Sequence, residues 1–457
     1  MTYLSGKDIR QQLTEALRGH KADYVEIRLE ESETSRLHYR GRTLEEVTAN
    51  HHIGGNVRAL VAGGWGFVSF NDLNQLGAKV ELAVSQARMA GKETSHLAPV
   101  KPEVYIDDRS MPQFPPLTTK KQLLDSYNEL IWATPHVQTS FMTYSDGWKH
   151  VILATTEGSY IEQKRPDVTF RVTVVARDGG EVQQANLSEG SAGEFSAISN
   201  LHARVKEIAQ RAVAMLSAPP VKGGEYTIIL DPILAGVFVH EAFGHLSESD
   251  FVYENPRLQE IMVMGRRFGG KHLNIVDGAL IPNLRGSYLY DDEGVPASKS
   301  YLVREGLLVG RLHSRETAAK MGEKTSGNAR AFSYRFPPIV RMTNTIIEPG
   351  QASFDELIGD IKEGIYAKNW YGGTTSMEMF TFSAGETYMI RNGEVAELLR
   401  PAILTGNVFT TLEQIDAIGN DLDMNQGGGC GKGGQVPLPV SNGSPHIRIH
   451  RCLVGGR

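Results

Sequence analysis

The stretch HEAFGH at residues 240–245 places two histidines and a glutamate where they could serve a metal ion. Zinc peptidases usually carry H-E-x-x-H on a helix, because histidines four residues apart share a face and the adjacent glutamate can activate water. Here His245 comes one residue later, and positions five apart on an α-helix diverge by roughly 140°. A metal site at His240 and His245 therefore requires a local distortion of the helix.

Two features around the motif indicate how this distortion could arise. The apolar segment before it stops at Asp231-Pro232, and Asp and Pro are preferred at the N-cap and first position of a helix. The motif is therefore expected on a helix, where a π-type turn with i to i+5 bonding would align the histidines. Alternatively, Gly244 would let the helix end or bend before His245, because glycine has permissive dihedral angles. The spacing alone does not separate a metal site from two packing histidines.

A catalytic zinc ion usually has three protein ligands and one position open to water, so a third donor is needed. Cys430 is the strongest candidate, because the surrounding glycines of QGGGCGKGGQ (residues 426–435) allow a close backbone approach and thiolates bind zinc well. Lys432 is expected to help hold the thiol as a thiolate. Glu248 and Asp250 are competing oxygen ligands, with a solvated helix end or a cap as their alternative role. The alternative for the glycine-rich segment is a flexible surface loop.

Other polar groups are weaker candidates for the site. Strand alternation would place Cys452 on one face with two histidines near the C-terminus, but the arginine between those histidines argues against a cation there. The segment DDEG at residues 291–294 is expected to form a hairpin turn rather than a catalytic carboxylate pair. Four further side chains could bind substrate or a partner, or could have polar structural roles in loops. They are Asn328, Arg330, Arg341 and Asn344.

Composition restricts the class of protein that these residues could serve. The chain has 457 residues, 40% hydrophobic and 22% charged, which is typical of folded globular proteins with more than one domain. Its net charge is −6, and no basic tract is interleaved with aromatics, so nucleic acid is not an expected partner. The charged N-terminal segment does not resemble a secretory signal, and no stretch is long enough to span a membrane. With two cysteines in all, we expect a cytoplasmic protein with reduced thiols.

The pattern of apolar runs predicts two domains of an α+β protein. Residues 1–217 alternate helical and strand patterns and are predicted to form a mixed α and β N-terminal domain. An amphipathic helix at residues 199–216 leads into SAPPVKGG, where we place the boundary. Residues 218–457 contain short apolar runs separated by turn residues, which predicts a mostly antiparallel β domain that carries the metal-site helix.

At these motifs the sequence resembles the TldD/PmbA family, and specifically its TldD-type, metal-bearing subunit. HEAFGH matches the H-E-x-x-x-H signature of that subunit, and CGKGGQ matches its late glycine-rich cysteine motif. Between them, the segments GSYLYDDEGVPAS, TSGNARAFSYRFPPIVRMTN and IIEPG are also similar to family segments, in the same order. The C-terminal half matches motif by motif, whereas the N-terminal half is compatible in length and pattern.

The resemblance implies a zinc-dependent peptidase. The metal would be held by His240, His245 and Cys430, with Glu241 acting on water as general base. Expected substrates are peptides or unstructured polypeptide segments. The expected partner is a TldE/PmbA-type subunit that lacks the metal motif, or a second copy of the same chain. Two other functions remain open: a zinc hydrolase of a non-peptide amide, and a metal-stabilised binding or assembly subunit without turnover.

Overall fold

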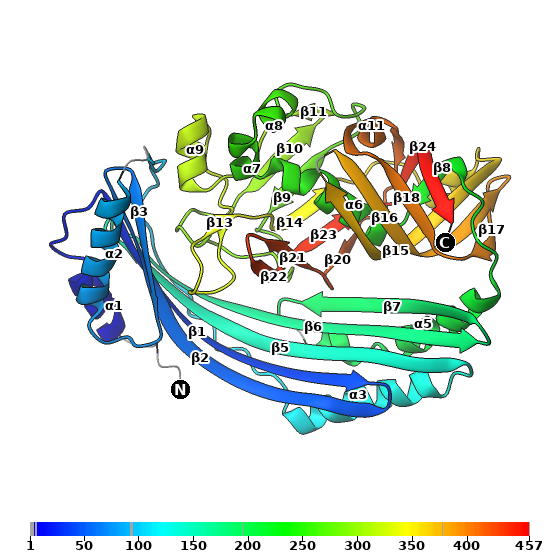
Figure 1. Ribbon diagram of the computed structural model, residues 1–457, viewed down its shortest axis with the longest axis horizontal. Coiled ribbons are helices and arrows are strands. Elements are labelled where there is room, and N and C mark those ends of the chain that lie inside the picture. The colour runs from blue at the N-terminus through cyan, green and yellow to red at the C-terminus, as the bar shows by residue number, and fades with distance from the viewer. Residues whose placement is uncertain (1–3, 5–6, 92–94, 194, 377, 457) are drawn as a thin grey trace.

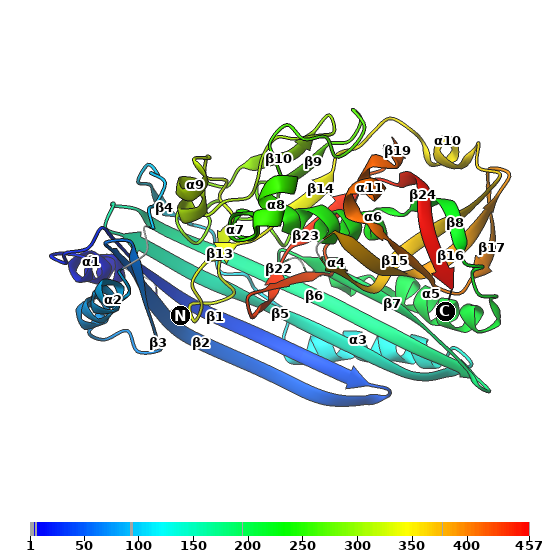
Figure 2. The same ribbon diagram turned by 45° about the horizontal axis from the view of Figure 1, so that its top comes forward.

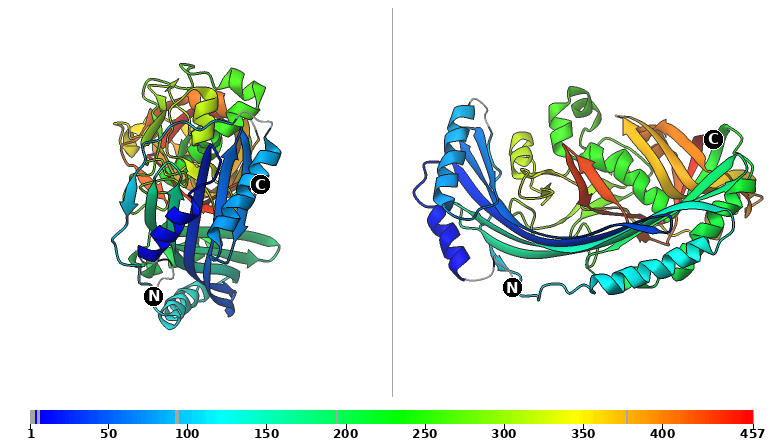
Figure 3. Two further views of the ribbon diagram at one scale, coloured as in Figure 1. Left: turned by 90° about the vertical axis from the view of Figure 1, so that its left-hand side faces the viewer. Right: turned by 60° about the horizontal axis from the view of Figure 1, so that its bottom comes forward.

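The structure is a computed structural model and describes residues 4, 7–91, 95–193, 195–376 and 378–456. A long curved sheet from the N-terminal half lies beneath a compact, β-rich C-terminal half (Figure 1). Turning the molecule shows that the long strands run side by side under the C-terminal half (Figure 2). The C-terminal half therefore rests in the concave face of the sheet, and helix α3 lies on its outer face (Figure 3).

The N-terminal sheet has the order β3-β2-β1-β5-β6-β4, with β7 also paired to β6. All of its neighbours are antiparallel except β4 and β6. Its strands are β1 (Tyr24–Arg40), β2 (Thr43–Val61), β3 (Gly64–Phe70), β4 (Val104–Ile106), β5 (Val137–Thr155), β6 (Tyr160–Asp178) and β7 (Glu181–Ser191). The helices of this half are α1 (Lys7–Ala16), α2 (Leu76–Ala90), α3 (Leu117–Trp132), α4 (Ser196–Ser199) and α5 (His202–Ser217).

Two separate apolar clusters cover the ends of this sheet. At one end α2 packs on β3, and Gly66 permits the contact because a Cβ there would lie 1.9 Å from the carbonyl oxygen of Ala83. At the other end α3 and α5 pack on β5, β6 and β7 around the fully buried Phe170 and Tyr127. The middle of the sheet differs, since β1 presents buried polar residues such as Arg28 there. The central part of the sheet thus offers a polar face.

In the C-terminal half, β15 pairs with both β8 and β16, which closes the order β15-β8-β24-β18-β16 into a ring. The strands of this sheet are β8 (Gly224–Leu230), β15 (Glu363–Ser376), β16 (Met379–Arg391), β17 (Glu394–Leu399), β18 (Ala402–Asn407), β19 (Ile415–Ile418) and β24 (Ile447–Gly456). A second sheet contains β9 (Ile275–Gly278), β10 (Lys299–Arg304), β11 (Leu307–Leu308), β14 (Asn344–Ile347), β20 (Asp423–Asn425) and β23 (Ser441–Ser444).

Two small hairpins and several short helices complete this half. The hairpins are β12 (Ala329–Arg330) with β13 (Ile339–Val340), and β21 (Gly429–Lys432) with β22 (Gln435–Pro439). The helices are α6 (Pro232–Val239), η1 (His240–Gly244), η2 (His245–Ser247), α7 (Ser249–Glu254), α8 (Pro256–Ile261), α9 (Arg315–Met321), α10 (Phe354–Ile358) and α11 (Val408–Glu413). Within the described residues, no helix is both long and apolar enough to cross a lipid bilayer.

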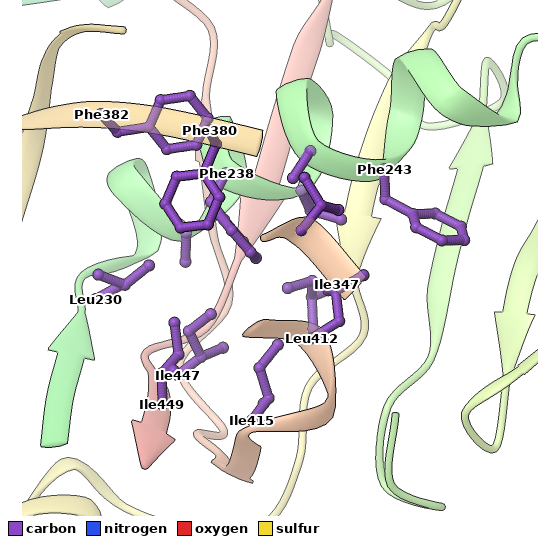
Figure 4. Packing of buried hydrophobic residues seen from close by; sticks show 14 of the residues in the cluster. Leu230, Phe238, Phe243, Ile347, Phe380, Phe382, Leu412, Ile415, Ile447 and Ile449 are labelled. Atoms are coloured by element: carbon purple, nitrogen blue, oxygen red, sulfur yellow. The ribbon is translucent and has the colours of Figure 1, made fainter. Parts of the chain in front are cut away.

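Helix α6 is the buried centre of the C-terminal half. Phe238 packs edge-on against Phe380 and Phe382 of β16, with ring centroids 5.4 and 6.2 Å apart (Figure 4). Ile447 and Ile449 of β24 belong to the same cluster. Burial of each such side chain contributes about 1.5–3 kcal/mol, so the position of α6 is firmly held.

The predicted α+β class is confirmed, because helices accompany mostly antiparallel strands in both halves. The amphipathic helix predicted at residues 199–216 is found as α5, beginning a few residues later. The division of the chain into domains at residues 217 and 218 stays a prediction.

Candidate metal centre

The extra residue in HEAFGH is accommodated by a π-helical turn. Asp231 caps α6 as predicted, since its Oδ1 accepts a hydrogen bond from the backbone N–H of Leu234 at 2.8 Å. After Val239 the chain widens into η1, where the backbone N–H of His245 donates to the carbonyl of His240. This i to i+5 bond brings positions five apart onto one line. Of the two distortions considered, the π turn is the one found.

Gly244 does not act through the alternative considered from the sequence, in which its flexibility ends or bends the helix. Its φ and ψ are −58° and −51°, ordinary right-handed helical values, so the helix neither ends nor bends there through glycine's conformational freedom. Instead, a Cβ at this position would lie 2.1 Å from Sδ of Met342, which is fully buried. The glycine is needed because the π-helical turn packs tightly against Met342.

Cys430 reaches the histidines from the β21–β22 hairpin. Its two-residue turn consists of Gly433 and Gly434, with φ of 56° and 76°, a conformation that favours glycine. The glycine-rich segment is therefore a hairpin rather than a flexible loop. Sγ of Cys430 lies 3.4 Å from Nε2 of His245, and the donor atoms of His240, His245 and Cys430 all lie within 4.8 Å of one another.

The electrostatics of this cluster favour a thiolate at Cys430. Burial raises the pKa of the Cys430 thiol, but the facing imidazoles of His240 and His245 overcome that effect and lower it to about 4. The group is therefore a thiolate at neutral pH. Burial lowers the pKa of His240, whereas the Cys430 thiolate raises it, with a net increase. Nδ1 of His240 is buried and has no hydrogen-bond partner among the described residues. One thiolate and two imidazoles are ligands that suit zinc.

Glu248 lies behind His245 and orients it. The Nδ1–H of His245 donates to Oε2 of the fully buried Glu248 at 3.1 Å, which leaves Nε2 facing Cys430. Carboxylates in this position fix the tautomer and ring orientation of metal-binding histidines. Burial raises the pKa of Glu248, but His245 and Lys432 lower it to about 2. Glu248 is thus an ionised neighbour of a candidate ligand, not a member of the donor cluster.

Lys432 does not have the role predicted for it. Its Nζ lies 3.0 Å from Oε2 of Glu248 and 2.7 Å from Oδ1 of Asp250, and it also donates to the carbonyl of Val340. Lys432 therefore joins the hairpin to the segment after His245 by ion pairs, while the histidines hold the thiolate. Asp250 is occupied by this ion pair and is not part of the donor cluster.

Glu241 has its carboxylate next to the donors. Its Oε2 lies 4.0 Å from Nε2 of His245, and its side chain is 33% exposed. By contrast, His240 and Cys430 are 3% and 4% exposed. A partly exposed carboxylate beside a buried donor cluster can receive a proton from a water molecule that enters from solvent.

The C-terminal histidine and cysteine that the sequence did not favour as metal ligands do not lie in the donor cluster. Cys452 is buried, and burial alone raises the pKa of its thiol to about 12. His446 instead bonds Asp421 at 2.6 Å and Tyr366 at 2.8 Å. Among the described residues, neither Cys452 nor His446 is near enough to the three donors to join them.

The DDEG segment forms the expected turn, closed by Gly294 with φ of 79°, and additionally connects the two halves. Asp292 pairs with Arg165 of β6 at 3.0 Å, and Glu293 pairs with Arg58 of β2 at 2.7 Å. Sequence reasoning missed these contacts, because the partners are distant in the chain and no local pattern marks them.

The four polar residues between the motifs all bind neighbouring polar groups and are buried. Nδ2 of Asn328 donates to Asp277 at 2.9 Å, and Nδ2 of Asn344 donates to the carbonyl of Gly278 at 2.7 Å. The guanidinium groups of Arg330 and Arg341 donate to carbonyls of β22. Arg330 and Arg341 thereby hold β22 in place, and β22 pairs with β21, the strand that carries Cys430.

Comparison with known proteins supports the family resemblance. Family models of the PmbA/TldA metallopeptidases match residues 25–90 (domain 1), 112–216 (central domain) and 223–456 (C-terminal domain). A metalloprotease of Synechocystis sp. is 48% identical over 441 residues, 95% of each chain. A zinc metalloprotease TldD homolog of Saccharolobus solfataricus is 35% identical over 325 residues, 70% of this chain and 72% of the relative.

The fold has a counterpart among solved structures. TldE from Thermococcus kodakarensis superposes with a TM-score of 0.76 at 16% identity, covering 98% of this chain and 100% of that one. This likeness shows a shared fold. The family models, which together match most of the chain, and the sequence relatives show more: the chain belongs to the PmbA/TldD family of metallopeptidases.

Proposed function

We propose that this chain is the metal-bearing subunit of a zinc-dependent peptidase that hydrolyses peptides or unstructured polypeptide segments. The observation that carries the proposal is the cluster of His240, His245 and Cys430, with donor atoms within 4.8 Å of one another. These residues would hold the ion. When bound, zinc supplies Lewis-acid activation of water and of the scissile carbonyl.

The protein's own groups would then perform the proton transfers. Glu241 accepts the proton of the attacking water and delivers it to the departing amine. Glu248 keeps the Nδ1–H of His245 engaged, so that Nε2 of this ring points toward Cys430. In this mechanism the thiolate of Cys430 is a ligand and makes no covalent bond to the substrate.

The first test is the metal content of the purified protein, measured by elemental mass spectrometry. Near one zinc per chain is expected for the wild type, with loss in His240→Ala, His245→Ala and Cys430→Ala. The matched control is Cys452→Ala, which removes an equally buried thiol away from the cluster and should retain zinc. Absence of zinc in the wild type, even after protected purification and reconstitution, would contradict the site.

The second test is the variant Glu241→Gln, assayed on unstructured polypeptides. It should retain zinc and lose about 10²–10⁴-fold in turnover, because a positioned general base contributes on that order. Turnover of small amides without hydrolysis of polypeptides would favour the non-peptide hydrolase. Full zinc occupancy without any turnover would favour a metal-stabilised binding or assembly subunit.

The assembly and location are part of the same proposal. The protein would act in the cytoplasm as a dimer, either with a TldE/PmbA-type subunit lacking the metal motif or with a second copy of itself. The structural likeness to TldE of Thermococcus kodakarensis supports a related subunit as partner. Light scattering of the chain alone, and after co-expression with such a subunit, separates the two assemblies.

A further inference from the structure

A cavity of about 710 Å³ lies between the long sheet and the C-terminal half. Residues of β1, β5 and β6 line one side, while the segment 279–289, Phe332 and residues 437–439 of β22 line the other. Its volume is within the range of about 300–1,000 Å³ that is typical of sites for small molecules. The residues of the candidate metal centre do not line it, so it is a separate feature of the molecule.

One part of the cavity wall has more positive than negative charge. Arg28, Lys149 and Arg165 meet there around two carboxylates. Asp292 lies 3.0 Å from Arg165 and 3.7 Å from Arg28, while Glu30 lies 2.7 Å from Arg28 and 3.8 Å from Lys149. These three cations therefore share two ion-paired carboxylates; Glu26 also acts on Arg28 but is itself paired with Arg58.

Arg330 adds a fourth cation to this wall. It is 5% exposed and donates to the carbonyls of Met342 and Pro439. In the part of the chain that the structure describes, no carboxylate lies within ion-pair distance of it. Burial lowers the pKa of Arg330, and the positive charges of Arg341 and Arg165 also lower it, whereas Tyr288 and the more distant Asp292 oppose them. A buried guanidinium without a counterion is costly unless an anion can approach.

The hydrogen bonding of these cations is also incomplete. Nε of Arg165, Nε of Arg330, and Nε and Nη1 of Arg28 are buried without a hydrogen-bond partner among the described residues. Buried polar groups are normally paired, so these nitrogens leave the guanidinium charges poorly compensated from within the protein. The side chains of Arg165 and Lys149 remain 21% and 31% exposed, so these two can meet a ligand in the cavity. Burial also lowers the pKa of Lys149, against the opposing effect of Glu30.

The remaining wall contains apolar side chains that are open to solvent. Leu280 and Leu289 are 53% and 46% exposed, and Ile281 is 39% exposed. Phe332 lines the same space, and Lys149 lies 5.0 Å from the centroid of its ring. Apolar surface beside a few convergent polar groups is the usual composition of a small-molecule site.

We propose that this cavity binds a small organic carboxylate, with its anionic head against Arg165 and Lys149 and its apolar body against Phe332 and the leucines. The ligand carboxylate compensates the positive charge that Asp292 and Glu30 leave. This site is independent of the metal reaction proposed above and exists whether or not that reaction occurs.

The test is isothermal titration calorimetry of the full chain with three aryl carboxylates and their neutral primary amides. The pairs are phenylacetate, 4-phenylbutyrate and 2-naphthylacetate, each with its amide. At least one carboxylate should bind about tenfold or more tightly than its amide, because hydrogen bonds to charged groups exceed neutral ones by that amount. Arg165→Gln and Lys149→Gln should each weaken this binding about tenfold or more.

Arg109→Gln is the matched control, because Arg109 lines the same cavity but donates two hydrogen bonds to Asp107, at 2.8 and 2.6 Å, whereas Arg165 shares Asp292 with Arg28. Its affinity should stay within about twofold of the wild type. Near-ultraviolet circular dichroism verifies that each variant is folded. If Lys149→Gln does not fold, the affinity of Arg165→Gln alone tests the proposal. The proposal is overturned if no carboxylate binds better than its amide. The proposal is also overturned if Arg165→Gln binds the carboxylate as tightly as the wild type does. The ligand would then bind at another place, such as the candidate metal centre.

Discussion

Replacing Glu248 by glutamine should weaken zinc binding by about ten- to a hundredfold, the usual effect of removing a carboxylate that orients a metal-binding histidine. The magnitude follows from the surroundings of this fully buried side chain. Its pKa is lowered from 4.5 to about 2, which corresponds to about 3 kcal/mol in favour of the charged form. His245 and Lys432 share this stabilisation, so His245 accounts for only part of it. A tenfold to hundredfold loss in zinc affinity corresponds to about 1.4–2.8 kcal/mol, which is of the same order.

The assay is competition for zinc with a chromogenic chelator of known affinity, at pH 7.5. The matched control is Asp250→Asn, because Asp250 binds the same Lys432 but has no contact with the ring of His245. Its zinc affinity should stay close to that of the wild type. Wild-type affinity in Glu248→Gln, or an equal loss in both variants, would refute the argument that the carboxylate acts through Nδ1 of His245.

Two further predictions concern stability, measured by urea unfolding. Gly244→Ala should reduce the free energy of unfolding by about 1–3 kcal/mol, because its Cβ would collide with buried Met342, whereas Gly428→Ala, with open space around it, should be neutral. Burial raises the pKa of the Asp231 carboxyl to about 6, so the folded protein binds a proton at this carboxyl more tightly than the unfolded chain does. The stabilisation that this proton gives is lost as the pH rises through 6. Asp231→Asn keeps a capping acceptor but has no charge to bury. The free energy of unfolding of this variant minus that of the wild type should therefore rise by about 3 kcal/mol between low pH and pH above 7. About half of this rise should occur between pH 5 and 7.5. Overlapping curves for Gly244→Ala and wild type, or a pH-independent difference for Asp231→Asn, would contradict these two predictions.

Local patterns in the sequence predict the start of the metal-site helix, because the capping preferences of Asp231 and Pro232 act within a single turn. They also single out Cys430, since its flanking glycines are unusual. They do not predict the hairpin that carries Cys430 or the ion pairs of Lys432, because these depend on how distant segments pack. Arg58 and Glu293, for example, are 235 positions apart.

The same limit applies to the N-terminal half. Strand patterns are visible in the sequence, but the curvature of the sheet and the polar face that it presents to the C-terminal half are not. Arg28 illustrates the reason: within β1 it resembles an ordinary solvent-facing arginine, yet the C-terminal half covers it to 2% exposure. Burial of this kind is a property of the assembled molecule.

The separation of the proposed metal ligands along the chain has a consequence for folding. Cys430 and His245 are 185 positions apart, so a zinc ion held by both would act as a cross-link closing a very long loop. By the loop-entropy relation for cross-links, such closure disfavours the unfolded chain by about 5 kcal/mol. The two cysteines of this protein form no disulfide, so a bound zinc ion would provide a cross-link with a stabilising effect comparable to that of a disulfide. During synthesis, this cross-link could close only after β21, which carries Cys430, had been made.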